Sequence, residues 1–283
     1  MISSSILTRF WRQLWAQNVT RGIKLSVVAI ISTAIVVLVI ATNNFSQDVD
    51  FPEQILTIQK PIVVFPDFAS INSISARKQQ FFDYLEVFVI AENIAITQFR
   101  DQLDDYLKIT SSGAGFSEFE RAWVFRLARR YQIEVENYSE KEIVDELLLR
   151  VDVLPVSLAL AQAANESAWG TSRFALEGNN IFGQWCYEQG CGIVPARRQA
   201  GAIHEVRSFV SVEDAIESYF LNINSHPSYS YLRDLRSRMR ARGLRLDSMS
   251  LAIGLGRYSE RGDDYVDEVQ KIIIQNGLRK RDV

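Results

Sequence analysis

The chain has 283 residues, of which 47% are hydrophobic and 23% charged, and its formal net charge is −3. These proportions are ordinary for globular proteins and exclude a wholly disordered or fibrous chain. The slightly acidic balance argues against a dedicated nucleic-acid-binding protein. With only two cysteines and two histidines, the chain also lacks the ligands of a zinc finger.

Charge is spread unevenly, and the first 44 residues are the clearest case. They contain the basic residues Arg9, Arg12, Arg21 and Lys24 and no acidic residue. The uncharged stretch Leu25–Ala41 follows. As a helix it would be about 26 Å long, near the short end for a bilayer span. Because basic flanks stay in the cytoplasm, everything after about residue 42 is expected on the other side of the membrane.

Two interpretations of this apolar stretch stay open. It is either a signal-anchor that stays in the membrane or a cleaved signal peptide, with Val39-Ile40-Ala41 as a poor cleavage site. The long basic leader and the weak site favour the anchor. The predicted organisation is a cytoplasmic leader over 1–24, a transmembrane helix over 25–42, a stalk over 43–70 and an exported domain over 71–283.

Helical patterns dominate the exported part. Apolar residues recur at helical spacing from about Ala76 to Lys108, and Ser111–Gly115 ends that helix. The apolar positions are Phe81, Phe82, Leu85, Phe88, Val89 and Ile96. Three capping boxes predict further helix starts, namely Ser117-x-x-Glu120, Ser139-x-x-Glu142 and Ser211-x-x-Asp214. Pro155 is expected as the first residue of another helix.

Residues 183–210 differ from the rest because they are rich in glycine and contain both cysteines. Short apolar pairs in this stretch predict a small β-hairpin lobe. Cys186 and Cys191 are separated by four residues, and two glycines help the chain turn. In an oxidising compartment they can close a hairpin disulfide. A redox or metal pair would need further ligands or a βαβ context, so a structural disulfide is expected.

One acidic residue stands out on chemical grounds. The helix expected from Pro155 to Gly170 has Glu166 in its last turn, at the negative end of the helix dipole. Ala163 and Trp169 are its neighbours at i−3 and i+3. Both effects disfavour the charged form and raise the pKa, as a general acid near neutral pH requires. The competing interpretation is an exposed glutamate that simply ends a helix.

The sequence around Glu166 resembles a known family. Ala161-Gln-Ala-Ala-Asn-Glu-Ser-Ala-Trp-Gly-Thr-Ser-Arg173, followed by Gly178-Asn-Asn-Ile-Phe-Gly183, is similar to the core motif of the glucosaminidase domain. That domain is glycoside hydrolase family 73, with a lysozyme-like fold. The resemblance is closer to the Bax-type branch of bacterial proteins and covers roughly residues 75–277. Its further motifs are Trp185-Cys186, Cys191-Gly192, His204-Glu-Val-Arg-Ser-Phe209, Ala215-x-x-Ser-Tyr219, Asn222-x-Asn-Ser-His226, Tyr229 and Tyr258-Ser-x-Arg-Gly-x-x-Tyr265.

The resemblance implies a fold and a set of site residues. The expected fold is a mainly α (α+β), lysozyme-like helical domain with a small β-hairpin lobe, preceded by one transmembrane helix. Glu166 matches the catalytic acid, which protonates the oxygen of the leaving sugar. The candidate substrate-binding residues are Tyr219, Tyr258, Asn180, Phe182, Trp169 and Tyr265. Core packing is the favoured alternative for Trp169 and Phe182, whereas the tyrosines are expected to line the cleft.

The second catalytic group is where this chain departs from the family. Members often carry a second carboxylate on the lobe, but no Asp or Glu occurs from Gln189 to Ile203. Glu188 and Glu205 flank the gap and are candidates to hold the attacking water, about 6.5–9.5 Å from Glu166. Glu205 can instead be structural. Two further routes stay open, either the 2-acetamido group of the substrate as nucleophile or a transglycosylase that makes an anhydro sugar.

The sequence therefore predicts an exported glycosidase that cleaves β-1,4-linked N-acetylglucosamine-containing strands of peptidoglycan. It is expected in the bacterial inner membrane with its domain in the periplasm, or secreted if the leader is cleaved. We expect no metal, no organic cofactor and no nucleic-acid partner. The competing class is a non-catalytic wall-binding scaffold. The arginine run 233–245 is expected to be a solvated helix face, and contact with the peptide carboxylates of peptidoglycan or with the membrane surface stays open as an alternative. His204 and His226 are expected to be structural.

Overall fold

A computed structural model describes residues 65–136, 138–196, 198 and 201–282 of the chain. The predicted leader, membrane helix and most of the stalk lie outside these residues. In the part that is described, no helix combines the length and apolar character needed to cross a bilayer. The long helices are α2 (Ile74–Ser111), α3 (Glu118–Arg130), α4 (Glu140–Arg150), α5 (Val156–Glu166), α7 (Val212–Ser225), α8 (Ser230–Ala241) and α10 (Asp263–Gln275).

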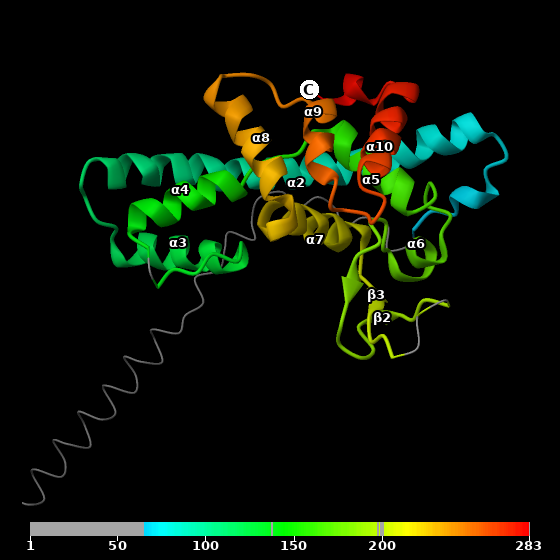
Figure 1. The fold of residues 1–283 in the computed structure, drawn as a ribbon, viewed down its shortest axis with the longest axis horizontal. Helices are drawn as coiled ribbons and strands as arrows, with labels where there is room; N and C mark the ends of the chain where they lie inside the picture. Colours follow the sequence, from blue (N-terminus) through cyan, green and yellow to red (C-terminus); the bar gives the residue numbers. More distant parts are fainter. Residues whose placement is uncertain (1–64, 137, 197, 199–200, 283) are drawn as a thin grey trace, which may run out of the picture. The chain divides into compact units, whose positions relative to one another are not determined.

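The short elements complete the described part. They are η1 (Phe68–Ser70), α6 (Arg173–Gly178), η2 (Pro227–Tyr229), α9 (Ser248–Ala252), η3 (Ile253–Leu255), η4 (Leu278–Arg281) and the strands β1 (Trp185–Cys186), β2 (Gly192–Ile193) and β3 (Glu205–Arg207). The described part is thus mainly helical with one small sheet beside α6 and α7 (Figure 1). The expected mainly α fold class is confirmed for these residues.

The longest helix, α2, follows its predicted pattern closely. Its six predicted apolar positions are all buried, and it packs against α4, α5 and α7. Each fully buried side chain of this kind stabilises the fold by roughly 1.5–3 kcal/mol. The helix ends at Ser111, just before Gly113, which has a φ of +82°. The packed domain begins before the predicted boundary at residue 71, because Phe65 and Phe68 are buried against Tyr84.

All three predicted capping boxes are present. Ser117, Ser139 and Ser211 each accept a hydrogen bond from the backbone three residues later, and the acid at that position bonds back to the cap. They begin α3, α4 and α7. A cap of this kind stabilises a helix by about 1 kcal/mol, so these helix starts are determined largely by local sequence.

Helix α5 lies at the centre of the domain. Residues 156–164 are all buried, and the helix packs against α2, α9, α10 and η4. Pro155 is its N-cap and not, as predicted, its first helical residue. Proline has no side-chain oxygen to accept hydrogen bonds from the first turn of the helix. The capping acceptor is instead a residue far along the chain. Ser157 donates from its backbone nitrogen (2.8 Å) and its hydroxyl (2.6 Å) to the carboxylate of Asp282.

The β-lobe, residues 183–210, is a three-stranded antiparallel sheet and not the predicted hairpin. Both β1 and β2 pair with β3, which lies between them. The predicted disulfide between Cys186 and Cys191 is confirmed, with the two Cα atoms 6.2 Å apart. It closes the turn that carries the chain from one edge strand to the other. Gly192 permits the close pairing, because a Cβ there would lie 2.0 Å from the carbonyl oxygen of Val206.

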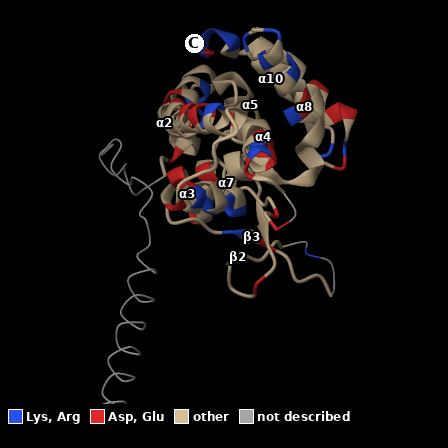
Figure 2. Ribbon diagram, turned by 90° about the vertical axis from the view of Figure 1, so that its left-hand side faces the viewer, with Lys and Arg blue, Asp and Glu red and all other residues tan. Residues whose placement is uncertain are grey.

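The predicted solvated arginine face is only partly correct. Arg236 is fully buried and Arg233 nearly so. Arg236 donates to backbone carbonyls at and after the end of α4, where the helix leaves its last carbonyls unpaired. Arg240 pairs with the buried Asp152 at 2.7 Å. Figure 2 shows the basic residues of α8 and of the segment after α10.

Candidate active site

Glu166 is the last residue of α5 and is partly exposed. The predicted end at Gly170 is wrong by four residues. The helix stops because Ala168, Trp169 and Gly170 adopt left-handed backbone angles, with φ of 50°, 61° and 73°. This turn sends Trp169 toward α2, where its ring lies 5.2 Å from that of Phe82. The structure therefore places Trp169 in an aromatic cluster on α2.

The pKa of Glu166 is raised, in the direction that the sequence predicts. Burial is the main cause, because it disfavours the charged carboxylate. A hydrogen bond from Tyr265 and the positive charge of Arg261 oppose the shift only in part. Burial is the kind of effect that the apolar neighbours were expected to have, although Trp169 itself turns toward α2. The result is a carboxylic acid that stays protonated at higher pH than an ordinary glutamate.

A buried chain of hydrogen bonds leads to Glu166. Tyr219 donates its hydroxyl proton to the amide oxygen of Gln162 at 2.6 Å. Gln162 in turn donates from its amide nitrogen to the hydroxyl oxygen of Tyr265 at 2.9 Å. Since the Tyr265 oxygen already accepts that bond, its own proton is directed to Glu166. The chain of bonds fixes Tyr265 as a donor to the carboxyl group.

Aromatic rings support this arrangement. Phe182 and Tyr219 are stacked with ring centroids 3.8 Å apart, and Tyr258 and Tyr265 are stacked at 5.4 Å. The hydroxyl of Tyr258 donates to the carbonyl oxygen of Phe182 at 2.8 Å. Tyr219, Tyr265 and Phe182 are almost completely buried, whereas Tyr258 is partly exposed. Among the predicted tyrosines, Tyr258 is therefore the most exposed, whereas Tyr219 and Tyr265 belong to the chain of hydrogen bonds that leads to Glu166.

The turn at residues 180–184 brings the β-lobe to Glu166. Asn180 is buried and donates to the carbonyl oxygens of Gln184 (2.9 Å) and Arg207 (2.8 Å). Gly183 has a φ of +66°, and a Cβ on it would lie 3.4 Å from Oε2 of Glu166. The backbone of Gly183 is thus beside the carboxyl group, and Asn180 holds the turn in place.

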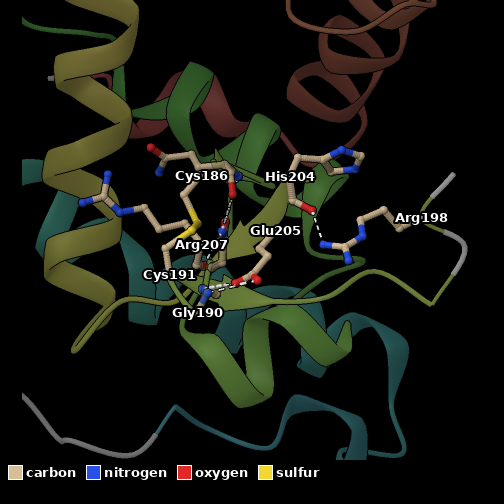
Figure 3. Close-up of a disulfide and its surroundings, with 10 residues drawn as sticks. Cys186, Gly190, Cys191, Arg198, His204, Glu205 and Arg207 are labelled. Carbon is tan, nitrogen blue, oxygen red and sulfur yellow. Dashed lines mark hydrogen bonds between the residues drawn. A yellow bond between two sulfur atoms is a disulfide. The ribbon is translucent and has the colours of Figure 1, made fainter. Parts of the chain in front are cut away.

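Glu205 and Glu188, the two candidates for the second acid, differ in burial and in their contacts. Glu205 is buried in β3 and accepts hydrogen bonds from the backbone nitrogens of Gly190 (3.1 Å) and Gly192 (2.9 Å). These bonds lower its pKa. Glu188 is exposed in the disulfide-closed turn. Figure 3 shows Glu205 directed at Gly190, beside the disulfide. Its observed contacts give Glu205 a structural role in the lobe.

Three contributors to the site were not predicted as site residues: Gln162, Gly183 and Arg261. Gln162 had a detectable signal, because it is a polar residue one helical turn before Glu166 in a mostly apolar helix and so shares its face. Arg261 lies within the Tyr258–Tyr265 motif and pairs with Glu268 at 2.6 Å. Gly183 could have been found as the last residue of the motif Gly178-Asn-Asn-Ile-Phe-Gly183, which resembles the family.

A pocket of about 490 Å³ lies elsewhere, at the opposite end of α5. Its lining includes Ile94 of α2, Pro155 and Arg245, and none of the predicted site residues. Across residues 65–136, 138–196, 198 and 201–282, no group of three or more His, Cys, Asp or Glu side chains is arranged to hold a metal ion.

Comparison with known proteins identifies the family of the chain. The model of the glucosaminidase family, described as mannosyl-glycoprotein endo-beta-N-acetylglucosaminidase, matches residues 141–278. The chain belongs to the glucosaminidase family of glycosidases, and to its Bax-type branch. It is 32% identical to the protein Bax of Escherichia coli (strain K12) over 201 residues, which cover 71% of this chain and 70% of Bax. The catalytic domain of the autolysin Auto from Listeria monocytogenes is 19% identical, with a TM-score of 0.36 over 64% of this chain and 97% of that one.

Proposed function

We propose that the protein is a glycoside hydrolase that cleaves β-1,4-linked N-acetylglucosamine-containing strands of peptidoglycan, with Glu166 as the general acid. The observation that carries the proposal is the state of Glu166. It combines a raised pKa, partial exposure and a directed hydrogen bond from Tyr265. Membership of a glycosidase family supplies the reaction class.

The mechanism follows from these contacts. Protonated Glu166 gives its proton to the glycosidic oxygen while the bond from that oxygen to the anomeric carbon breaks. Negative charge then develops on the carboxyl group of Glu166. The Tyr265 hydroxyl already points at this group and donates a hydrogen bond to the carboxylate that forms. This donor stabilises the carboxylate more than the acid, so its effect is larger in the transition state than in the ground state.

The contacts of Glu205 bear on how the reaction is completed after the glycosidic bond breaks. Because Glu205 is engaged by two backbone nitrogens, it is poorly suited to activate water. Its position favours routes that need one protein carboxylate. In one, the 2-acetamido oxygen attacks the anomeric carbon and water opens the resulting ring. In the other, an internal sugar hydroxyl attacks the anomeric carbon and passes its proton to the Glu166 carboxylate, which leaves an anhydro product, as in a lytic transglycosylase.

The test is mass spectrometry of the sugars that the full chain releases from purified peptidoglycan. We expect new saccharide ends with the native protein and none with Glu166→Gln. Glu177→Gln is a matched control, because Glu177 is an exposed glutamate of α6. Reducing N-acetylglucosamine ends would identify a glucosaminidase, and anhydro ends a transglycosylase.

The competing proposal of a wall-binding scaffold makes the opposite prediction. A scaffold would bind peptidoglycan and release no sugar, and Glu166→Gln would not change its behaviour. Absence of product from the native protein, with binding retained, would therefore overturn the enzyme proposal.

We also propose that residues 25–42 anchor the protein in the bacterial inner membrane, with the domain in the periplasm. The disulfide supports export, because such bonds persist in oxidising compartments. Inner-membrane vesicles can be prepared with the cytoplasmic face inside and the periplasmic face outside. Protease added to such intact vesicles should degrade the domain. Protection of the domain there would contradict this topology.

A further inference from the structure

One surface of the β-lobe is unexplained by the proposed acid chemistry. Trp185 of β1 is 55% exposed, and its ring is stacked on that of His204 with centroids 4.2 Å apart and planes at 12°. The other two tryptophans that the structure describes, Trp123 and Trp169, are buried or partly buried in aromatic clusters. We call the stacked pair Trp185 and His204 the aromatic platform.

The platform is held rigidly on both of its strands. Gln184, just before Trp185, donates to the carbonyl oxygen of Ala215 and accepts from Ser218 of α7, at 3.0 and 2.8 Å. Cys186, just after it, is in the disulfide. On β3, His204 precedes the anchored Glu205, and the two side chains point in opposite directions (Figure 3). The backbone on both sides of Trp185 is thus held in place, and the stack on His204 orients the exposed indole ring.

The platform is also continuous with the Glu166 site. Gly183, whose backbone lies beside the Glu166 carboxyl group, is two residues before Trp185. Two extended residues span at most about 7 Å. A chain-like ligand bound at Glu166 therefore passes close to the platform if it runs toward the lobe.

We propose that the aromatic platform is an additional glycan subsite that stacks against one sugar ring of the bound strand. The flat indole face matches the C–H face of a pyranose ring, and a pre-oriented ring binds without losing side-chain freedom. Close to the platform in sequence, Tyr187 and Ile203 are also exposed, at 64% and 67%. Arg198, which donates to the His204 carbonyl oxygen at 3.3 Å, is a polar neighbour that can bond sugar hydroxyl groups. This inference rests on the proposed function, since it concerns the same substrate.

The experiment measures binding of a peptidoglycan octasaccharide, freed of its stem peptides, by calorimetry. The full chain carries Glu166→Gln throughout, so that the ligand is not consumed. Adding Trp185→Ala should raise the dissociation constant about three- to tenfold, the range typical of one aromatic stacking contact. Trp185→Phe should restore most of the affinity, because it keeps a flat ring. Octasaccharide should also change the tryptophan fluorescence, and Trp185→Ala should remove that change.

Tyr231→Ala is the matched control, because Tyr231 is a similarly exposed aromatic residue, at 52%, but lies on α8. It should leave the dissociation constant unchanged. In the otherwise native chain, Trp185→Ala should raise KM and leave kcat nearly unchanged, whereas a merely structural role would lower kcat and the melting temperature.

Two negative results are distinguishable. An equal octasaccharide affinity with and without Trp185 would overturn the subsite alone, and would leave the platform as a contact for another molecule. Failure of the octasaccharide to bind any variant, together with no product from the native chain, would overturn the proposed function and this subsite with it.

Discussion

The surroundings of Glu166 and the β-lobe hold their glutamates in opposite ways. Glu166 is set among packed helices, where burial raises its pKa and favours the protonated acid. Glu205 is in a strand of three residues, where two backbone nitrogens lower its pKa and favour the carboxylate. The comparison teaches that neighbours determine what a carboxyl group can do. The first is suited to donate a proton, and the second to remain charged and to hold the disulfide-closed turn.

The two regions also differ in what stabilises them. The helices bury continuous apolar faces, and the starts of α2, α3 and α4 are capped by residues close in sequence. The lobe has strands of only two or three residues, too short for independent stability. It depends instead on the disulfide, on Glu205 and on Asn180. Damage to one region should therefore have consequences that differ in kind from damage to the other.

The largest expected effect is a loss of activity, and it should follow substitution of Glu166 but not of Glu205. Glu166→Gln should lower kcat by about 10²- to 10⁴-fold, the usual contribution of a general acid. It should not destabilise the fold. Because the folded-state pKa is raised, the contribution of Glu166 to stability is present in acid and is lost as pH rises through that pKa. Urea denaturation should therefore show the variant more stable than the native chain at pH 8 and equal to it at pH 3.

A second, smaller effect should appear in the lobe. Glu205→Ala leaves the backbone nitrogens of Gly190 and Gly192 without their acceptor, so the turn to which they belong should open more readily. Hydrogen exchange should accelerate in the lobe and stay unchanged in α5. The exposed Glu188 gives a matched control, Glu188→Ala, with little change expected. Equal acceleration in α5 would show that the two regions are not separate.

The disulfide should contribute about 2 kcal/mol by restricting the unfolded chain. Replacing both Cys186 and Cys191 by serine should lower the urea midpoint by a corresponding amount and leave the far-ultraviolet circular dichroism unchanged. Reductant should have the same effect on the native chain and none on the variant. Loss of helical signal on reduction would contradict the independence of the helical region.

The smallest predicted effect is a pH shift. Tyr265→Phe removes a hydrogen bond that lowers the pKa of Glu166, so that pKa should rise further. Since a general acid must be protonated, the alkaline limb of the pH–rate profile should move to higher pH. Tyr258→Phe is the control, because its hydroxyl bonds the Phe182 carbonyl oxygen. An alkaline limb that moves down or stays fixed would exclude Tyr265 as the donor.

Local patterns predicted much of this structure. Capping boxes, apolar periodicity and the cysteine spacing correctly indicated α2, α3, α4, α7 and the disulfide, because each depends on residues close in sequence. The end of α5 was missed, since Ala168 and Trp169 rarely adopt left-handed angles. Gln162 was missed because its partners, Tyr219 and Tyr265, are 57 and 103 residues away. No local rule reveals such a pairing.

The cap on α5 has a consequence for the order of events during synthesis. Ser157 is bonded by Asp282, which follows it by 125 residues. At about 5–20 residues per second, a ribosome adds that length in roughly 6–25 s. Throughout this interval the helix that carries Glu166 has all its own residues but no side-chain cap at its start. Its final arrangement is therefore a late event, completed only after the lobe and the aromatic supports of the site have already emerged.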